Sequence, residues 1–201
     1  MNTSLRSSAL VGGISLALMA LLAPLGLLMA LPAGETRFAA LVVLVIAALD
    51  VVVAVALYPL LAPGGRLLAQ IAVAMRVAYG TVFAVAAGSL LEPVDVAHFQ
   101  AIWDAGLLIF GVHLVLVGLA VIRCPLIPTW IGVLVLIAGA GYTVDATLVA
   151  LSPGSTLAFA EFTFIGEVVL FVWLIGWGGK REHARDGSAD AQRRMTSQGV
   201  A

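Results

Sequence analysis

Charge is scarce in this sequence of 201 residues. Only 10% of the residues are Asp, Glu, Lys or Arg, whereas 62% are hydrophobic. Soluble domains contain about 25% charged and about 45–50% apolar residues. The composition therefore excludes an ordinary soluble protein and predicts a polytopic membrane protein. With a net charge of −1 and no basic domain, the chain offers no surface for nucleic acid.

Residues for metal or nucleotide chemistry are also scarce. Cys124 is the only cysteine, so an internal disulfide and a cysteine-based metal site are both excluded. His98 and His113 are expected at very different depths, and we predict no metal site. The sequence has no Walker loop, dinucleotide fingerprint, His-Glu-x-x-His or Gly-x-Ser-x-Gly motif. We therefore expect no cofactor, and no ATP-driven transport by this chain alone.

Alternating strand patterns are missing, and long apolar runs take their place. A transmembrane helix needs about 20 mostly apolar residues. Six such spans are predicted, at about 8–31, 38–61, 67–91, 97–122, 127–150 and 156–178. The fold class is therefore an all-α six-helix transmembrane bundle, a single domain over residues 1–178. Residues 179–201 are polar and of mixed charge, which predicts a disordered cytoplasmic tail.

The first span could be confused with a signal peptide, because Arg6 gives it a basic start. Its apolar stretch is much longer than the apolar region of a signal peptide, which has roughly 7–15 residues. We interpret it as a retained helix that Pro24 kinks toward its outer end.

The distribution of basic residues predicts the orientation. With six spans, one side of the membrane collects eight of them: Arg6, Arg66, Arg123, Lys180, Arg181, Arg185, Arg193 and Arg194. The opposite side collects only Arg37, and Arg76 lies inside a span. By the positive-inside rule, both termini are expected in the cytoplasm of a bacterial cell, with the protein in the cytoplasmic membrane.

Ionisable residues within the spans are the candidate functional residues. There are seven: Asp50, Arg76, Asp104, His113, Asp145, Glu161 and Glu167. A charge at the centre of a bilayer costs about 2.5–3.5 kcal/mol even on insertion scales, so such residues usually have a structural or functional purpose. Asp50 and Glu167 fall near the centre of their spans. Asp104, Asp145 and Glu161 fall on the order of 9 Å toward the outside, from the helical rise per residue.

Helical phase limits which of these side chains share one site. At about 100° per residue, Arg76 and Tyr79 lie on one helix face, as do Tyr142 and Asp145. The resulting core set is Asp50, Arg76, Tyr79, Tyr142, Asp145 and Glu167, with His113 as a second choice. Asp104 and Glu161 are expected at wet helix ends. The glycines Gly111, Gly118, Gly139 and Gly141 of the fourth and fifth spans are expected to be close-packing positions.

Acids outnumber bases within this core set. Arg76 is always protonated and can neutralise one of Asp50, Asp145 and Glu167. His113 could neutralise a second acid if it were charged and close by. A carboxyl left over in apolar surroundings is expected to keep its proton, which makes it a ready general acid or proton carrier. A buried ion pair that only fixes helix register is the structural alternative.

Several of these residues lie in segments with a familiar pattern. The segments are Ala48-Leu49-Asp50-Val51-Val52, Tyr58-Pro59-Leu60-Leu61, Arg76-Val77-Ala78-Tyr79, Phe110-Gly111-Val112-His113-Leu114, Trp130-Ile131-Gly132 and Gly141-Tyr142-Thr143-Val144-Asp145. Together they resemble the prokaryotic membrane family catalogued as domain of unknown function 4386, over about residues 40–178. The resemblance implies a six-helix-type membrane fold and implies no activity.

Three functions are compatible with these residues. The first is a membrane-embedded acid–base enzyme for a lipophilic substrate, such as an isoprenoid-type cyclase or isomerase. Glu167 or Asp50 would be the acid, Asp145 the base, and Arg76 would tune them, while Tyr79, Tyr142 and His113 would line the substrate site. The second is a proton-coupled transporter or channel for a small solute. The third is an accessory subunit whose charges are structural. The expected partners are the lipid bilayer and a hydrophobic small molecule, with a homo-oligomer left open.

Overall fold

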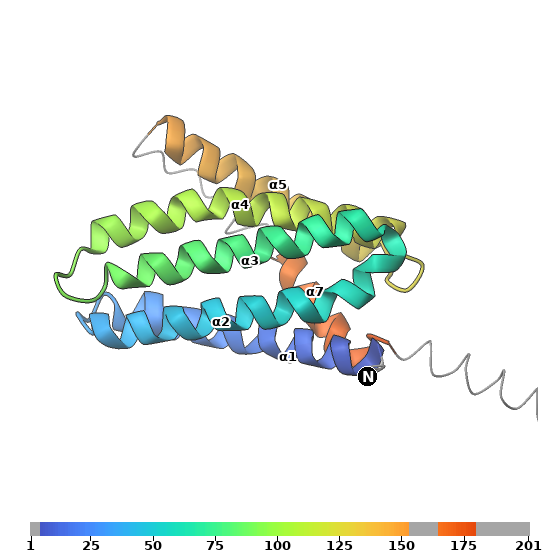
Figure 1. The fold of residues 1–201 in the computed structure, drawn as a ribbon, viewed down its shortest axis with the longest axis horizontal. Coiled ribbons are helices and arrows are strands. Elements are labelled where there is room, and N and C mark those ends of the chain that lie inside the picture. The colour runs from blue at the N-terminus through green and yellow to red at the C-terminus, as the bar shows by residue number, and fades with distance from the viewer. Residues whose placement is uncertain (1–4, 153–164, 180–201) are drawn as a thin grey trace, which may run out of the picture.

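All elements in the described part of the chain are helical (Figure 1). The computed structural model describes residues 5–152 and 165–179. The elements are α1 (Leu5–Ala23), η1 (Pro24–Ala30), α2 (Thr36–Leu61), η2 (Ala62–Gly64), α3 (Arg66–Gly88), α4 (Val96–Arg123), α5 (Thr129–Leu151) and α7 (Ile165–Gly176). The predicted all-α class is confirmed, and the apolar helices are consistent with a multi-pass membrane protein.

Within the described part of the chain, five helical segments are long and apolar enough to cross a membrane. They are Leu5–Ala30, Thr36–Gly64, Arg66–Gly88, Val96–Arg123 and Thr129–Leu151, each within a few residues of a predicted span. Helix α7 has 12 residues and covers the second half of the predicted span 156–178. The first half of that span and the predicted tail from residue 180 onward lie outside the described residues. The count of six spans and the disorder of the tail therefore stay predictions.

Proline changes the helix type where the sequence predicted a kink. At Pro24 the α-helix gives way to a π-helical stretch that runs to Ala30. Proline has no N–H to donate to the carbonyl four residues earlier, so it removes one hydrogen bond from the α-helical ladder. Pro59 lies inside α2 without ending it, close to the turn that leads to α3.

The helices pack in chain order around one interior. Each of α1 to α5 contacts the next helix along the chain, and α7 contacts both α5 and α1. The arrangement is therefore a ring in which the last described helix returns to the first (Figure 1). Side chains that point inward from α2, α3, α4, α5 and α7 are thereby brought near one another, which decides the composition of the candidate site.

Glycines hold α4 and α5 in close contact. A Cβ added to Gly118 would lie 2.7 Å from the backbone nitrogen of Leu136, and one added to Gly132 would lie 2.8 Å from Ile122 Cγ1. Gly111 and Gly139 are equally confined by backbone of the facing helix. The prediction that glycines of these two spans are close-packing positions is confirmed for Gly111, Gly118 and Gly139.

Arg6 ties the end of α7 to the start of α1. Its guanidinium donates from Nη1 to the carbonyls of Leu174 (3.2 Å) and Gly178 (2.9 Å), and from Nη2 to the carbonyl of Ile175 (2.7 Å). The last carbonyls of a helix have no partner within the helix and carry partial negative charge. A cation there satisfies both needs, and it closes the ring of helices at this end.

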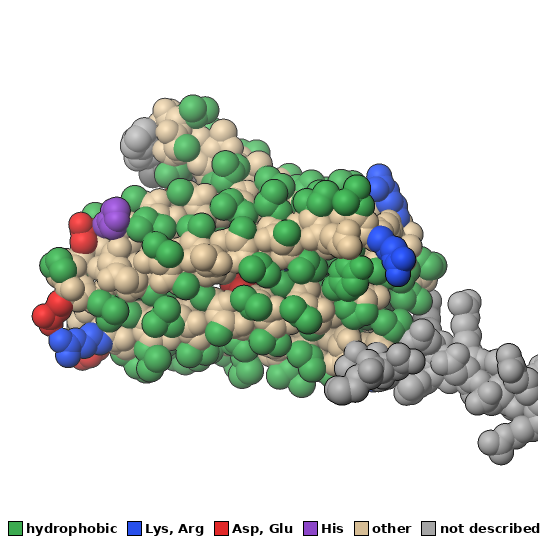
Figure 2. Space-filling view, viewed as in Figure 1, with side chains coloured by type: hydrophobic (Ala, Val, Ile, Leu, Met, Phe, Trp, Pro, Cys, Tyr) green, Lys and Arg blue, Asp and Glu red, His purple; other side chains and the backbone are tan. Residues whose placement is uncertain are grey.

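Charged side chains gather at the two ends of the molecule (Figure 2). At one end, Arg37 and Glu92 form an exposed ion pair with 2.6 Å between Nη2 and Oε1. At the other end lie Arg66 at the start of α3 and Arg123 at the end of α4. The surface between the ends is mostly apolar in this view, as expected for a face in contact with lipid.

Candidate functional site

An ion pair between Asp50 and Arg76 lies in the middle of the bundle. Asp50 is on α2 and Arg76 on α3, and Arg76 Nη2 is 2.7 Å from Asp50 Oδ1. The side chains are 0% and 2% exposed. Two fully buried charges are tolerated only as a pair, because either one alone would be left without compensation. The cation of the predicted set thus binds Asp50 rather than Asp145 or Glu167.

His113 on α4 hydrogen-bonds to Arg76 as a neutral side chain. Its Nε2 is 3.2 Å from Arg76 Nη1, and its Nδ1 is 2.7 Å from the carbonyl oxygen of Ala72. A guanidinium can only donate, so Nε2 must accept, and a carbonyl can only accept, so Nδ1 must carry the proton. With one proton on the ring, His113 is uncharged and does not serve as a second cation for the acids.

Aromatic rings form the wall next to the ion pair. The Phe110 ring centroid is 5.6 Å from Arg76 Cζ, within range of a cation–π interaction. Tyr79 packs against Phe110 at a tilt of 39° with 4.7 Å between centroids, and Tyr142 meets the same ring edge-on at 5.2 Å. Sequence reasoning did not assign Phe110 to the site. Its position three residues before His113, on the same face of α4, was the available signal.

Gly80 lets α3 approach Asp50 closely. A Cβ at this position would lie 3.1 Å from Asp50 Cβ and 3.2 Å from the Ala47 carbonyl oxygen, which is tighter than most real contacts. Arg76 lies one helical turn earlier on the same face of α3. The glycine therefore brings the α3 backbone near enough for Arg76 to reach the carboxylate, a role that the sequence did not reveal.

Glu167 lies beside this ion pair without being part of it. It is half-buried near the start of α7, and its side chain interacts with the Tyr142 hydroxyl. Arg76 and Asp50 both lie close enough to act on it electrostatically. Among the residues that the structure describes, the ion pairs are Arg76 with Asp50 and Arg37 with Glu92. Glu167 is thus an acid near the bundle middle that has no direct ion pair.

Asp145 on α5 lies close to Tyr142 as well. It lies one turn after Tyr142 on α5, is half-buried, and acts electrostatically on the Tyr142 hydroxyl. We call Tyr142, Asp145 and Glu167 the Tyr142 group. The structure therefore brings the six predicted core residues and His113 into two adjacent clusters, one around Arg76 and one around Tyr142.

The remaining predicted acids are separate from these clusters. Asp104 accepts a hydrogen bond from Gln100 Nε2 at 2.9 Å on the more exposed face of α4. Glu161 lies outside the described residues. Within residues 5–152 and 165–179, no three His, Cys, Asp or Glu side chains converge as a metal site would require. Cys124 is buried, and its thiol donates to the Leu60 carbonyl at 3.3 Å.

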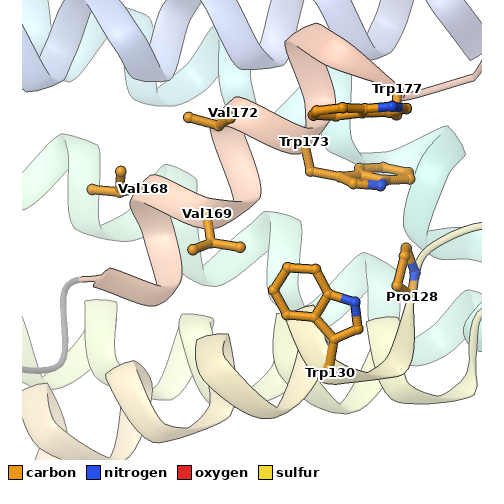
Figure 3. A pocket seen from close by; sticks show the side chains of 7 residues that line it. All are labelled: Pro128, Trp130, Val168, Val169, Val172, Trp173 and Trp177. Carbon is orange, nitrogen blue, oxygen red and sulfur yellow. The ribbon is translucent and has the colours of Figure 1, made fainter.

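Two open grooves lie on the outer surface of the described helices, away from the acids. One, of about 480 Å³, lies between α5 and α7 and is bordered by Trp130, Trp173 and Trp177 (Figure 3). The other, of about 620 Å³, lies between α1 and α2 along Val51, Val55 and Tyr58. No carboxylate lines either groove, so neither is part of the candidate site.

A family model described as domain of unknown function 4386 matches residues 9–99 and 95–178. The chain belongs to this family. A protein of Archaeoglobus fulgidus that is described as uncharacterized is 35% identical over 138 residues, which are 69% of this chain and 82% of the relative. No solved structure matches the chain.

The family match confirms the resemblance seen in the polar segments and extends it. It begins at residue 9, so it includes the first span, which the resemblance over residues 40–178 left out. Asp50, Arg76 and Tyr79 lie in the first matched range, and the Tyr142 group lies in the second. The family carries no activity that could be transferred, so function has to be argued from the geometry.

Proposed function

We propose that this member of the family is a membrane-embedded acid–base enzyme that acts on a lipophilic substrate. The observation that carries the proposal is the division of the charges. Arg76, the buried arginine of the described residues, lies 2.7 Å from Asp50, and Glu167 is left beside a tyrosine hydroxyl. Compared with the sequence-based assignment, Asp50 and Arg76 become positioning residues, and Glu167 becomes the acid.

A carboxyl without a cation in apolar surroundings retains its proton and can donate it as a general acid. In an isomerase of the isoprenoid type, the Glu167 proton would add to one carbon of an alkene. The Asp145 carboxylate would then remove a proton from a neighbouring carbon, which shifts the double bond. Glu167 ends the step ionised and Asp145 protonated, so one proton must return between them.

The Tyr142 hydroxyl supports this return, because both carboxyl groups act on it. A hydroxyl can accept a proton from Asp145 while it donates its own to Glu167. No cofactor and no metal enters the cycle. Substrate would arrive from the bilayer, since Glu167 and Tyr142 are half-buried rather than sealed in the core.

Solvent isotope incorporation tests the proposal without knowledge of the substrate. Washed membranes that contain the wild-type protein, incubated in D₂O where lipid synthesis no longer runs, are expected to gain a lipid with deuterium bound to carbon, detected by mass spectrometry of the total lipid extract. The Glu167→Gln variant should lose this product at unchanged protein level. Asp104→Asn, which makes the same kind of change outside the clusters, should retain it. Equal incorporation in the wild type and Glu167→Gln would refute the assignment of the acid.

A proton-coupled transporter for a small solute is the second candidate. It is favoured by the depths of two carboxyl groups: Asp145 lies nearer the end of the molecule that carries Glu92, and Glu167 lies near the middle of the bundle. Proteoliposomes that enclose a pH-sensitive dye would show proton entry that depends on Glu167 if this candidate holds, together with no labelled lipid. An accessory subunit would show neither result, and its acids would affect only stability.

The topology and membrane belong to the same proposal. The chain is proposed to cross the bacterial cytoplasmic membrane six times, with both termini in the cytoplasm. The closeness of Arg6 to the end of α7, at the end of the molecule where α3 starts and α4 ends, supports termini on one side. Positive charge at that end supports its placement in the cytoplasm.

A further inference from the structure

Four polar atoms of the buried ion pair lack hydrogen-bond partners. They are Asp50 Oδ1 and Oδ2 and Arg76 Nε and Nη2. Oδ1 and Nη2 touch at 2.7 Å, but they are not aligned as a hydrogen bond. Oδ2 and Nε likewise have no hydrogen-bond partner, although both side chains are at most 2% exposed. Buried polar atoms without partners are rare in folded proteins, and each requires an explanation.

Asp50 Oδ2 and Arg76 Nε require opposite hydrogen-bond partners. Asp50 Oδ2 is an acceptor that lacks a donor, and Arg76 Nε–H is a donor that lacks an acceptor. A single neutral group that both donates and accepts would satisfy the two together. An anionic ligand would place a second negative charge against Asp50, and an amine would place a second positive charge against Arg76. A hydroxyl fits both atoms without adding charge.

The residue of α3 that faces Asp50 has no side chain that could satisfy the carboxylate. Gly80 faces Asp50, and a Cβ built on it would already lie 3.9 Å from Oδ2. With a hydrogen in place of a side chain, Gly80 offers no side-chain donor to this oxygen. On the other side, the Arg76 guanidinium is fixed by His113 and Phe110, so that Nε cannot turn to another acceptor without loss of those contacts.

We propose that Asp50 and Arg76 form a binding site for a hydroxyl group, which donates to Asp50 Oδ2 and accepts from Arg76 Nε. Two sources share this chemistry: a buried water molecule and the alcohol end of a lipophilic molecule that enters the bundle. Buried waters typically make about three hydrogen bonds to polar groups of this kind. The inference concerns the Arg76 cluster and does not depend on whether Glu167 donates a proton.

Solid-state NMR of the wild-type protein in lipid bilayers tests the site directly. With ¹³C,¹⁵N-labelled full-length protein, the Arg76 Nε–H resonance is expected to show a short-range correlation to a hydroxyl proton. His113 Nδ1–H provides an internal control, because it is equally buried but already donates to the Ala72 carbonyl. It should show no such correlation. The measurement needs no variant, so misfolding of a variant cannot obscure the result.

Added ligands distinguish the two sources. The probes are farnesol and its methyl ether, which differ in the hydroxyl hydrogen that Asp50 Oδ2 would accept. If the site takes a lipophilic alcohol, farnesol replaces the water correlation with one to its own hydroxyl, and the ether does not. If the site holds water alone, the water correlation persists with both probes. Absence of any hydroxyl correlation at Arg76 Nε, with and without farnesol, would overturn the proposal.

Discussion

At the scale of single residues, the buried pair of Asp50 and Arg76 places the strongest constraint on the bundle. Both side chains are excluded from solvent, and each compensates the charge of the other. The energetic consequence is asymmetric. Removal of one partner strands a charge in an apolar interior, whereas removal of both leaves only a packing defect.

The stability of paired variants should show this asymmetry. Asp50→Asn and Arg76→Met are each expected to lower the free energy of unfolding by about 3–5 kcal/mol, because each leaves a buried group without its partner. The double variant Asp50→Asn with Arg76→Met should lose less than the sum of the two single variants. Unfolding in mixed detergent micelles, followed by circular dichroism, measures the differences. Strict additivity would show that the two side chains do not act as a pair.

Glu167 differs from Asp50 at the same scale, since it is half-buried and lacks an ion pair. Glu167→Gln removes the acid but keeps size and hydrogen-bonding capacity toward Tyr142. We expect a change in stability below about 1 kcal/mol, because the substitution breaks no ion pair and leaves Tyr142 with a hydrogen-bond partner. The same unfolding assay checks this value. A loss as large as that of Asp50→Asn would indicate a structural carboxyl and would count against the proposed function.

At the scale of helices, the α4–α5 interface depends on glycine. Gly118→Ala would place a methyl group 2.7 Å from the Leu136 nitrogen and 2.8 Å from the Gly132 carbonyl oxygen. Backbone cannot move aside as a side chain can, so the helices must separate. We expect a loss of about 1–3 kcal/mol, the usual cost of overpacking. Thermal unfolding in detergent measures it.

Gly88→Ala supplies the matched control for this change. It also replaces a helical glycine with alanine, but no atom lies within 4 Å of the new Cβ. Since alanine is a better helix former by up to about 1 kcal/mol, this variant should be as stable as the wild type or slightly more so. Equal losses in both variants would indicate that helix propensity, rather than the interface, sets the cost.

The attachment of α7 is a second property at the scale of elements. Arg6→Gln removes a guanidinium that donates to three carbonyls at the end of this helix. Because hydrogen bonds with a charged partner contribute about 1.5–3 kcal/mol, we expect a stability loss in that range. Amides of residues 165–176 should exchange faster with deuterium, as hydrogen-exchange mass spectrometry would show.

Arg37→Gln is the corresponding control for charge loss alone. The ion pair of Arg37 with Glu92 is exposed on both sides, and exposed pairs contribute about 0–1 kcal/mol. This variant should leave exchange in α7 unchanged. If the Arg6 and Arg37 variants had the same stability and the same exchange in α7, the hydrogen bonds of Arg6 to the end of α7 would contribute nothing to stability. Arg6 would then matter only as a positive charge that orients the protein in the membrane.

At the scale of the whole molecule, the two ends differ in charge, which predicts the orientation in the membrane. In a Cys124→Ser background, which keeps a donor for the Leu60 carbonyl, single cysteines at the exposed positions Pro63 and Val94 report on opposite ends. A membrane-impermeant maleimide added to intact cells is expected to label Val94→Cys and not Pro63→Cys. The reverse pattern would place the termini outside.

The sequence by itself determined the class of fold and the short set of residues of interest. Apolar runs of the length of a bilayer leave helices as the available structure, because an unpaired backbone in lipid is too costly. For the same reason, ionisable residues within the runs stood out at once. Helical phase even placed Arg76 with Tyr79 and Tyr142 with Asp145, since residues three apart always share a helix face.

The tertiary structure alone decided which acid Arg76 binds. Asp50, Asp145 and Glu167 were equal candidates along the chain, because a sequence gives depth and face but not the distances between helices. Those distances depend on residues without charge: Gly80 brings α3 to Asp50, and the glycines of α4 and α5 determine how closely these two helices approach. The neutral form of His113, with its proton on Nδ1, likewise depends on a hydrogen bond to the Ala72 carbonyl of a different helix. No local sequence pattern predicts that hydrogen bond.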